Sequence, residues 1–161
     1  MKKVFTAFLL TLCVLIFSGC SKDKSNTDFG YRPEGTKVTL VPGEKFNADE
    51  DGLSATIDYF EGASCYYDGL DKQFKYEGYE VTTYPGDNGD IIQDISISAE
   101  NVKTSKGVGV GSALSDVEKA YGNNYKVSEK MYQFYQDDTR YIYFFILNDV
   151  VKYYGYAIDV R

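Results

Sequence analysis

The densest group of chemically reactive side chains in the sequence follows Cys65. Asp68, Asp71 and Lys72 all lie within seven residues of this cysteine. A thiolate nucleophile needs a nearby base or cation, and Lys72 could lower the pKa of Cys65 if the fold brought the two together. Histidine, the usual proton relay, does not occur anywhere in the sequence. We therefore expect Cys65 to be a small buried side chain, with Asp71 and Lys72 organising its loop.

The absence of histidine excludes several other sites from this 161-residue chain. It removes Ser-His-Asp and Cys-His catalysis, histidine-ligated zinc or haem, and a histidine pH switch. Residues 47–52, followed by Asp58, imitate a calcium loop, but they begin with Asn and no amphipathic helix flanks them. The glycine-rich residues 107–112 lack the spacing of a phosphate-binding loop. We predict no enzymatic activity, no cofactor and no metal.

The first twenty residues are typical of an exported protein. Two lysines precede residues 4–17, which carry no charge and are too few to cross a bilayer. The next residues complete the sequence Phe17-Ser18-Gly19-Cys20, which resembles a bacterial lipobox, although leucine is commoner where Phe17 stands. That resemblance implies removal of the signal peptide 1–19 and lipidation of Cys20, whose acyl chains would anchor the protein to the extracytoplasmic face of the cell membrane. The alternative is a plain secretory signal with an incidental cysteine.

Removal of the signal peptide would leave an acidic chain with one unmodified thiol. Without Lys2 and Lys3, 15 basic and 24 acidic residues remain, a net charge of −9. Such a charge disfavours nucleic acid, which we therefore exclude as a partner. Cys13 would leave with the signal and Cys20 would carry lipid, so Cys65 would have no intramolecular disulfide partner.

Beyond Cys20, polarity divides the chain into a flexible tether over residues 20–35 and a globular domain over 36–161. Short β-rich runs separated by Gly, Asn and Asp predict strands at 37–41, 73–77, 79–84, 91–98, 131–135, 139–147 and 150–158. One helix is expected after Gly111, capped by Ser112 or Ser115 and ended by Gly122. Its apolar stripe would be Leu114, Val117 and Tyr121.

An internal repeat underlies this pattern. Residues 43–54 can be laid on 111–122 at an offset of 68, and residues 76–97 on 135–156 at an offset of 59. The difference of nine residues indicates an extra loop around 61–71. Each repeat, 36–100 and 104–161, would contain one helix and a three-stranded meander, with both helices in one layer. The predicted fold class is therefore α+β, an antiparallel sheet with two short helices.

All sixteen tyrosines follow the lipobox, and many fall on predicted strands. In residues 141–147 the even positions form an ordinary core face, yet the odd positions are also aromatic. Tyrosine combines a large contact area with a polar tip and is enriched in recognition surfaces. Either helices cover these side chains or they bind a partner. The candidate partner-binding residues are Tyr141, Tyr143, Tyr154 and Tyr156.

Three stretches, residues 63–72, 79–85 and 104–122, together resemble an uncharacterised group of lipoproteins from clostridia and related Gram-positive bacteria. The repeated plan of helix and meander is similar to that of the secreted β-lactamase inhibitor protein and of small outer-membrane assembly lipoproteins. The resemblance implies a location and a fold but no activity.

We predict a lipid-anchored extracytoplasmic module that binds a protein or peptide, with a hydrolase inhibitor as a narrower version of that function. The alternative is an envelope enzyme or ligand-binding lipoprotein centred on Cys65, Asp71 and Lys72.

Overall fold

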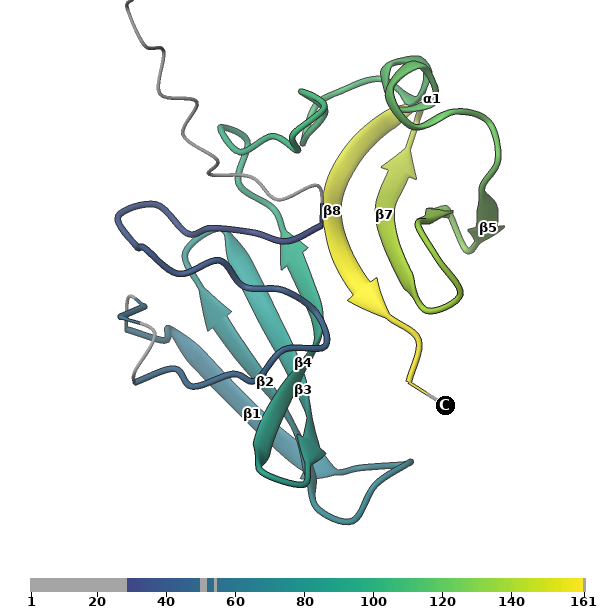
Figure 1. Ribbon diagram of the computed structural model, residues 1–161. Coiled ribbons are helices and arrows are strands. Elements are labelled where there is room, and N and C mark those ends of the chain that lie inside the picture. The colour runs from purple at the N-terminus through teal and green to yellow at the C-terminus, as the bar shows by residue number, and fades with distance from the viewer. Residues whose placement is uncertain (1–28, 50–51, 54, 161) are drawn as a thin grey trace, which may run out of the picture.

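Eight antiparallel strands form one continuous sheet in the computed structural model, which describes residues 29–49, 52–53 and 55–160 (Figure 1). The strands are β1 (Asp58–Ala63), β2 (Leu70–Tyr76), β3 (Tyr79–Gly86), β4 (Gly89–Ile97), β5 (Lys126–Ser128), β6 (Met131–Tyr135), β7 (Arg140–Leu147) and β8 (Val150–Ile158). Their order across the sheet is β1-β2-β3-β4-β8-β7-β6-β5. The signal peptide 1–19, Cys20 and most of the tether lie outside the described residues. Within the described part of the chain, no helix is long and apolar enough to cross a membrane.

The predicted α+β class is wrong, because the structure is nearly all β. The single helix of the described residues, α1 (Leu114–Tyr121), lies where one was predicted and ends at Gly122 as expected, with a φ of 85° at that glycine, but it begins after Ala113. Neither predicted serine caps it; the Ala113 amide donates instead to the Asp116 carboxylate at 3.3 Å. The described part of 46–53, where the repeat places a second helix, forms turns. Asn, Asp and Gly dominate that segment and favour turns over helix.

The predicted hairpins are present with nearly the predicted bounds. β2 and β3 join at Glu77-Gly78, and β7 and β8 join at Asn148-Asp149. Both residues of the second turn have positive φ, 54° and 60°, as a type I′ hairpin requires. Residues 37–41 do not form a strand; only Leu40 pairs, with Tyr31. The edge strands β1 and β5 were not predicted, because neither shows a clear apolar alternation.

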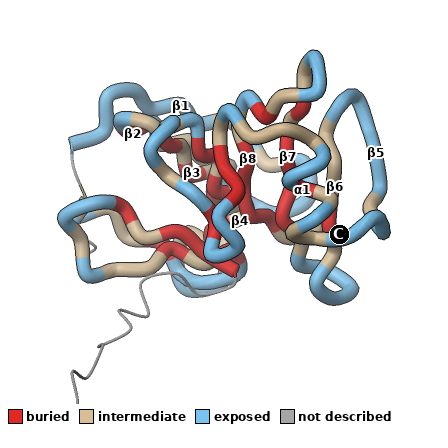
Figure 2. Tube along the Cα trace, turned by 90° about the horizontal axis from the view of Figure 1, so that it is seen from above, coloured by how far each residue is buried: buried red, intermediate tan, exposed pale blue. Residues whose placement is uncertain are grey.

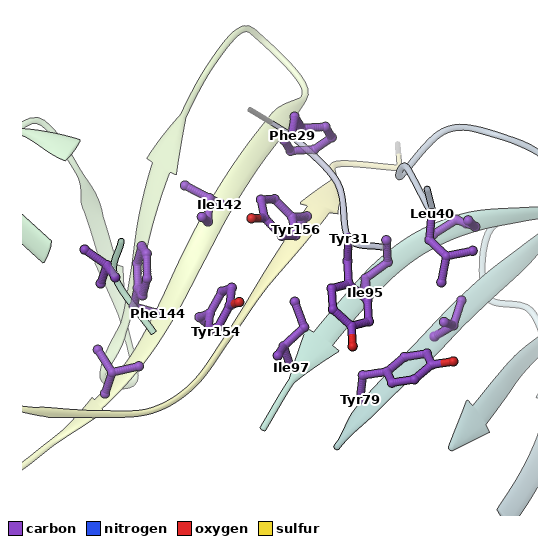
Figure 3. Packing of buried hydrophobic residues seen from close by; sticks show 14 of the residues in the cluster. Phe29, Tyr31, Leu40, Tyr79, Ile95, Ile97, Ile142, Phe144, Tyr154 and Tyr156 are labelled. Atoms are coloured by element: carbon purple, nitrogen blue, oxygen red, sulfur yellow. The ribbon is translucent and has the colours of Figure 1, made fainter. Parts of the chain in front are cut away.

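The hydrophobic core lies on one face of the sheet. Its buried residues concentrate on the central strands β3, β4, β8 and β7 (Figure 2). The segment containing Phe29, Tyr31 and Leu40 covers the middle of the sheet. Helix α1 covers the half formed by β5–β8 and buries Val117 in the core. Phe29 meets the ring of Tyr156 edge to face at 5.7 Å, and Tyr31 meets Tyr79 at 5.0 Å. Through these close aromatic contacts the N-terminal segment, an extended chain rather than a helix, packs on β3 of the first half and on β8 of the second (Figure 3).

The two four-stranded halves, β1–β4 and β5–β8, repeat the same backbone contacts. The Gly43 amide donates to Ile92 O at 2.7 Å, and the Gly111 amide donates to Val151 O at 2.9 Å. These pairs differ by the predicted offsets of 68 and 59. A β-bulge recurs too, after Thr82 in one half and after Phe145 in the other. The strand pairing therefore relates the halves by an approximate two-fold axis.

This axis passes through the junction of the halves, where β4 pairs with β8. Ser96 and Gly155 are partners there and also occupy equivalent positions, 59 residues apart. The bulges fall at Thr82/Thr83 and at Phe145/Ile146, so equivalent residues of β3 and β7 are 63 apart. Tyr84 therefore corresponds to Leu147, and the predicted alignment of Tyr84 with Tyr143 was wrong.

The halves differ most between their first two strands. The strand pairing gives an offset of 68 between β1 and β5, but an offset of 58 between β2 and β6. The first half therefore holds ten additional residues between these strands. They lie within residues 61–72, which comprise the end of β1, the connection between Ala63 and Leu70 and the start of β2, and which overlap the stretch 61–71 that the sequence offsets indicated.

Candidate binding surface

The four tyrosines predicted as partner-binding residues do not share an exposed face. Tyr154 and Tyr156 are 1% and 2% exposed and lie inside the core (Figure 3). They pair directly with Phe144 and Ile142 on β7, so they point to the same face as those core side chains. Tyr141 and Tyr143 lie on the opposite face. The expectation of one tyrosine surface is therefore corrected, because strand alternation divides these residues between two faces.

Tyr143 is buried although it lies on the face opposite the core. Its hydroxyl donates to Asp94 Oδ1 at 3.0 Å, which connects β7 with β4 across the intervening strand β8. This path crosses Gly155, where an added Cβ would lie 2.4 Å from the Tyr143 hydroxyl oxygen. The ring can therefore cross β8 only because position 155 has no side chain. The hydrogen bond fastens one half of the molecule to the other.

Burial raises the pKa of Asp94 to about 7, although the hydrogen bond from Tyr143 partly opposes this rise. The nearby Glu80 raises it further. Asp94, Tyr141 and Tyr143 line a hollow of about 330 Å³ on this face of the sheet. The carboxylate is already hydrogen-bonded within the protein, so we interpret it as a structural connection between the halves.

The predicted site around Cys65 is not assembled. Cys65 is exposed in the connection between β1 and β2, contrary to the expected burial. Lys72 Nζ instead contacts both carboxylate oxygens of Asp90, at 2.9 and 3.2 Å. The loop closes on itself, because the Ser64 amide donates to Gly69 O at 3.0 Å. Nothing in this geometry places Lys72 against the thiol or brings Asp71 to it.

The imitation calcium loop, residues 47–52, lies partly outside the described residues. Within residues 29–49, 52–53 and 55–160, no group of three or more Cys, Asp or Glu side chains could hold a metal ion.

Exposed apolar side chains gather in one short segment. Seven large hydrophobic side chains are exposed in the described part of the chain, and six of them belong to residues 57–70. The six are Ile57, Tyr59, Phe60, Tyr66, Tyr67 and Leu70. We call these six side chains the aromatic edge, because they lie directly before edge strand β1, on β1, on the connection that follows it and at the start of β2. Apolar residues concentrated on a surface in this way commonly mark an interaction site.

The first half alone carries the aromatic edge. At the offset of 68, Asp58, Tyr59 and Phe60 of β1 correspond to Lys126, Val127 and Ser128 of β5. Val127 is the seventh exposed apolar residue, and it stands alone on its edge. Tyr66 and Tyr67 have no counterpart, because they lie in the ten additional residues. The aromatic edge is therefore an addition to the shared backbone plan.

The aromatic edge is partly anchored to the sheet. Tyr59 packs on Phe74 at a ring distance of 5.1 Å, and Tyr67 stacks on Tyr84 at 4.9 Å. The Tyr59 hydroxyl also donates to Glu61, which raises the pKa of Tyr59 to about 12 and keeps the phenol neutral. Phe60 and Tyr66 are the most exposed members, at 66% and 71%. The anchored rings limit the freedom of the segment, while Phe60 and Tyr66 remain available for contact.

The sequence contained a partial signal for this surface. Residues 57–70 include six aromatic or large aliphatic side chains, yet they contain no Lys or Arg. Sequence reasoning gave weight to Cys65 in this stretch and to the longer tyrosine runs elsewhere. Only strand pairing shows that β1 is an edge strand.

Comparison with protein-family models, curated proteins and solved structures finds no match to the chain. The resemblance to clostridial lipoproteins and to the β-lactamase inhibitor protein stays a prediction.

Proposed function

We propose that this protein is a lipid-anchored extracytoplasmic module that binds a protein or peptide through the aromatic edge. The lipobox at Cys20 motivates the anchor. The absence of histidine from the sequence disfavours the main catalytic alternatives. The observation that carries the binding role is that six of the seven large apolar side chains exposed among the described residues lie within residues 57–70. Exposing these groups to water is unfavourable, and a partner that covers them gains about 25 cal/mol for each Å² of apolar surface removed from water.

The alternative centred on Cys65 receives no support from the geometry. Asp90 binds Lys72, and Cys65 is solvent-exposed. A cysteine nucleophile needs a neighbouring base or cation to be activated. We therefore do not propose an enzyme or a ligand-binding site here.

Matched variants of the full chain test the proposed binding role. The wild type, Phe60→Ser, Tyr66→Ser and Val127→Ser would each be used to capture proteins from envelope extracts. We expect Phe60→Ser and Tyr66→Ser to lose a protein that the wild type and Val127→Ser both retain. Val127 is the right control, because it is exposed and apolar but lies on the opposite edge. Equal capture by all four chains would contradict binding at the aromatic edge.

The anchor needs a separate test. A Cys20→Ala variant should carry no lipid and should lose the processing seen in the wild type. A variant that stays in the membrane fraction with the same processing as the wild type would contradict lipidation at Cys20.

A further inference from the structure

Strand β1 can accept another strand. It ends the sheet on the side of the first half, and no strand among the described residues pairs with its outer side. An edge strand presents unpaired backbone groups that an extended segment can bind. At the other end of the sheet, β5 has only three residues against the six of β1. Of the two edges, β1 therefore offers the longer backbone surface.

The two faces of β1 offer the same pair of side-chain types. Its register with β2 places Asp58 and Phe60 on one face, and Tyr59 and Glu61 on the other. The contact between Tyr59 and Phe74 identifies the second face as the core side of the sheet. A strand added beside β1 would therefore meet one ring and one carboxylate on each face.

Among the described residues, no cation binds the carboxylates of β1. Lys75 and Lys72 lie opposite Asp58 and Glu61 on β2, but no ion pair joins either couple in the described part of the chain. Lys72 binds Asp90 instead. Moreover, residues 46–71 contain no Lys or Arg. The edge therefore presents negative charge beside apolar surface.

This charge distinguishes between two occupants of the edge. A second copy of the chain would bring another Asp58 and Glu61 to the same short interface, and like charges between paired strands are destabilising. A basic segment would instead place cations beside these carboxylates. Charge complementarity therefore favours a basic partner over self-association.

We propose that the partner of the aromatic edge binds as an extended strand along β1, with two Lys or Arg residues flanking two apolar residues. This inference rests on the proposed function and specifies its partner. The spacing follows from β1 itself, where Asp58 and Glu61 flank Tyr59 and Phe60. Each cation of the partner lies beside a carboxylate, and each apolar side chain lies beside a ring.

Synthetic peptides test this spacing directly. The first probe contains the unit Lys-Val-Tyr-Lys between short Ser-Thr flanks, and the second contains Lys-Lys-Val-Tyr in the same flanks. A third probe keeps the first sequence but carries N-methyl groups on alternate residues, which prevents backbone pairing along one edge. Fluorescence anisotropy with the full chain would measure binding. We expect the first probe to bind at least about fivefold more tightly than either of the others.

Variants of β1 locate the binding. Phe60→Ser and the double change Asp58→Asn with Glu61→Gln should each weaken the first probe by about five- to tenfold. Val127→Ser should bind it as the wild type does. Backbone hydrogen exchange should slow in β1 when the probe binds, and stay unchanged in β5.

Equal binding of the first and second probes would overturn the spacing, because general attraction to an acidic chain would then explain both. Equal binding of the N-methylated probe would overturn strand addition. Failure of all probes, combined with protein capture that depends on Phe60, would overturn this inference and leave the proposed function standing. Failure of the probes and of Phe60-dependent capture would overturn both.

Discussion

The two halves of the sheet share a backbone plan but have different outer edges. Equivalent hydrogen bonds, equivalent bulges and a common junction at Ser96 and Gly155 relate β1–β4 to β5–β8. The second half ends in the short strand β5, with a single exposed apolar side chain, Val127. The first half ends in β1 and carries the aromatic edge. The edge strand of the second half is therefore short, whereas that of the first half is longer and carries exposed apolar side chains. The second of these arrangements is expected of a binding surface.

The same comparison separates structural tyrosines from those available for binding. Tyr143 and Tyr154 of the second half are buried by neighbouring strands, whereas Tyr59 and Tyr66 of the first half are exposed. Tyrosine content alone could not distinguish these roles, because both groups lie on or next to strands. Position within the sheet decides whether a ring is covered.

The largest expected effect concerns the junction of the halves. Gly155→Ala should reduce the free energy of unfolding by about 3 kcal/mol, because its Cβ would meet Ile95 O and the Tyr143 hydroxyl, each at 2.4 Å. Gly62→Ala, in β1, is the control, since its Cβ would make only an ordinary contact of 3.5 Å with Phe60. Urea unfolding of both variants measures the difference. Equal losses would show that the junction does not depend on the missing side chain at 155.

The second prediction concerns the pH dependence of the junction. The pKa of Asp94 rises from 3.8 to about 7 in the folded protein, so the native state holds this proton more tightly than the unfolded chain. The resulting stabilisation is fully present below pH 4 and is lost as the pH rises through about 7. Because of this raised pKa, the free energy of unfolding should fall by about 2–4 kcal/mol between pH 4 and pH 8.

Asp94→Asn should remove this part of the pH dependence. Tyr153→Phe is the matched control, because Tyr153 occupies the position equivalent to Asp94 and should leave the slope unchanged. Urea unfolding at pH 4, 6 and 8 measures all three chains. A slope that survives in Asp94→Asn would assign the pH dependence to other carboxyl groups.

A smaller effect should distinguish the halves at Lys72. Lys72→Met removes the 2.9 Å ion pair with Asp90 and should cost about 1 kcal/mol or less, because both groups are partly exposed to solvent. Lys130→Met changes the equivalent residue, which has no ion pair with the equivalent Asp149 among the described residues. Its unfolding free energy should stay the same. A similar loss in both variants would contradict a specific role for the pair in the first half.

The smallest expected effect is on the reactivity of Cys65. In a chain with Cys13→Ser and Cys20→Ser, the exposed Cys65 should react fully with a thiol reagent without denaturant. Lys72→Met should leave the reaction rate unchanged, since Asp90 binds Lys72. A rate that falls severalfold in Lys72→Met would restore the hypothesis of a lysine-activated thiol. The experiment thereby tests whether the additional loop adds chemistry or only contact surface.

Local patterns predicted the hairpins and the helix well, because their signals lie within a few neighbouring residues. Gly122 ends α1, and Asn148-Asp149 forms the turn between β7 and β8, since each residue type favours the conformation found there. The second helix was a false prediction. It transferred the pattern of residues 111–122 to residues 43–54, where Asn, Asp and Gly favour turns instead.

The candidate surface was less predictable than the elements. The alternation in residues 141–147 correctly separated Ile142, Phe144 and Ile146 as core residues, but it could not show what covers the opposite face. Tyr143 is buried there because it crosses Gly155, a contact between residues on neighbouring strands. The exposed aromatic edge was missed because its identity depends on β1 having a neighbour on only one side.

The sequence by itself determined the export signal pattern, the acidic charge, the missing histidine chemistry, the hairpin turns, and the repeat offsets of 68 and 59 that relate Gly43 to Gly111 and Ile92 to Val151. These properties follow from composition and from residues close together in the chain. Only the tertiary structure decided which tyrosines are buried, that Lys72 binds Asp90, and that β1 is an edge strand. Each of these depends on strands brought together from distant parts of the chain, and pairing of that kind leaves no local signal in the sequence.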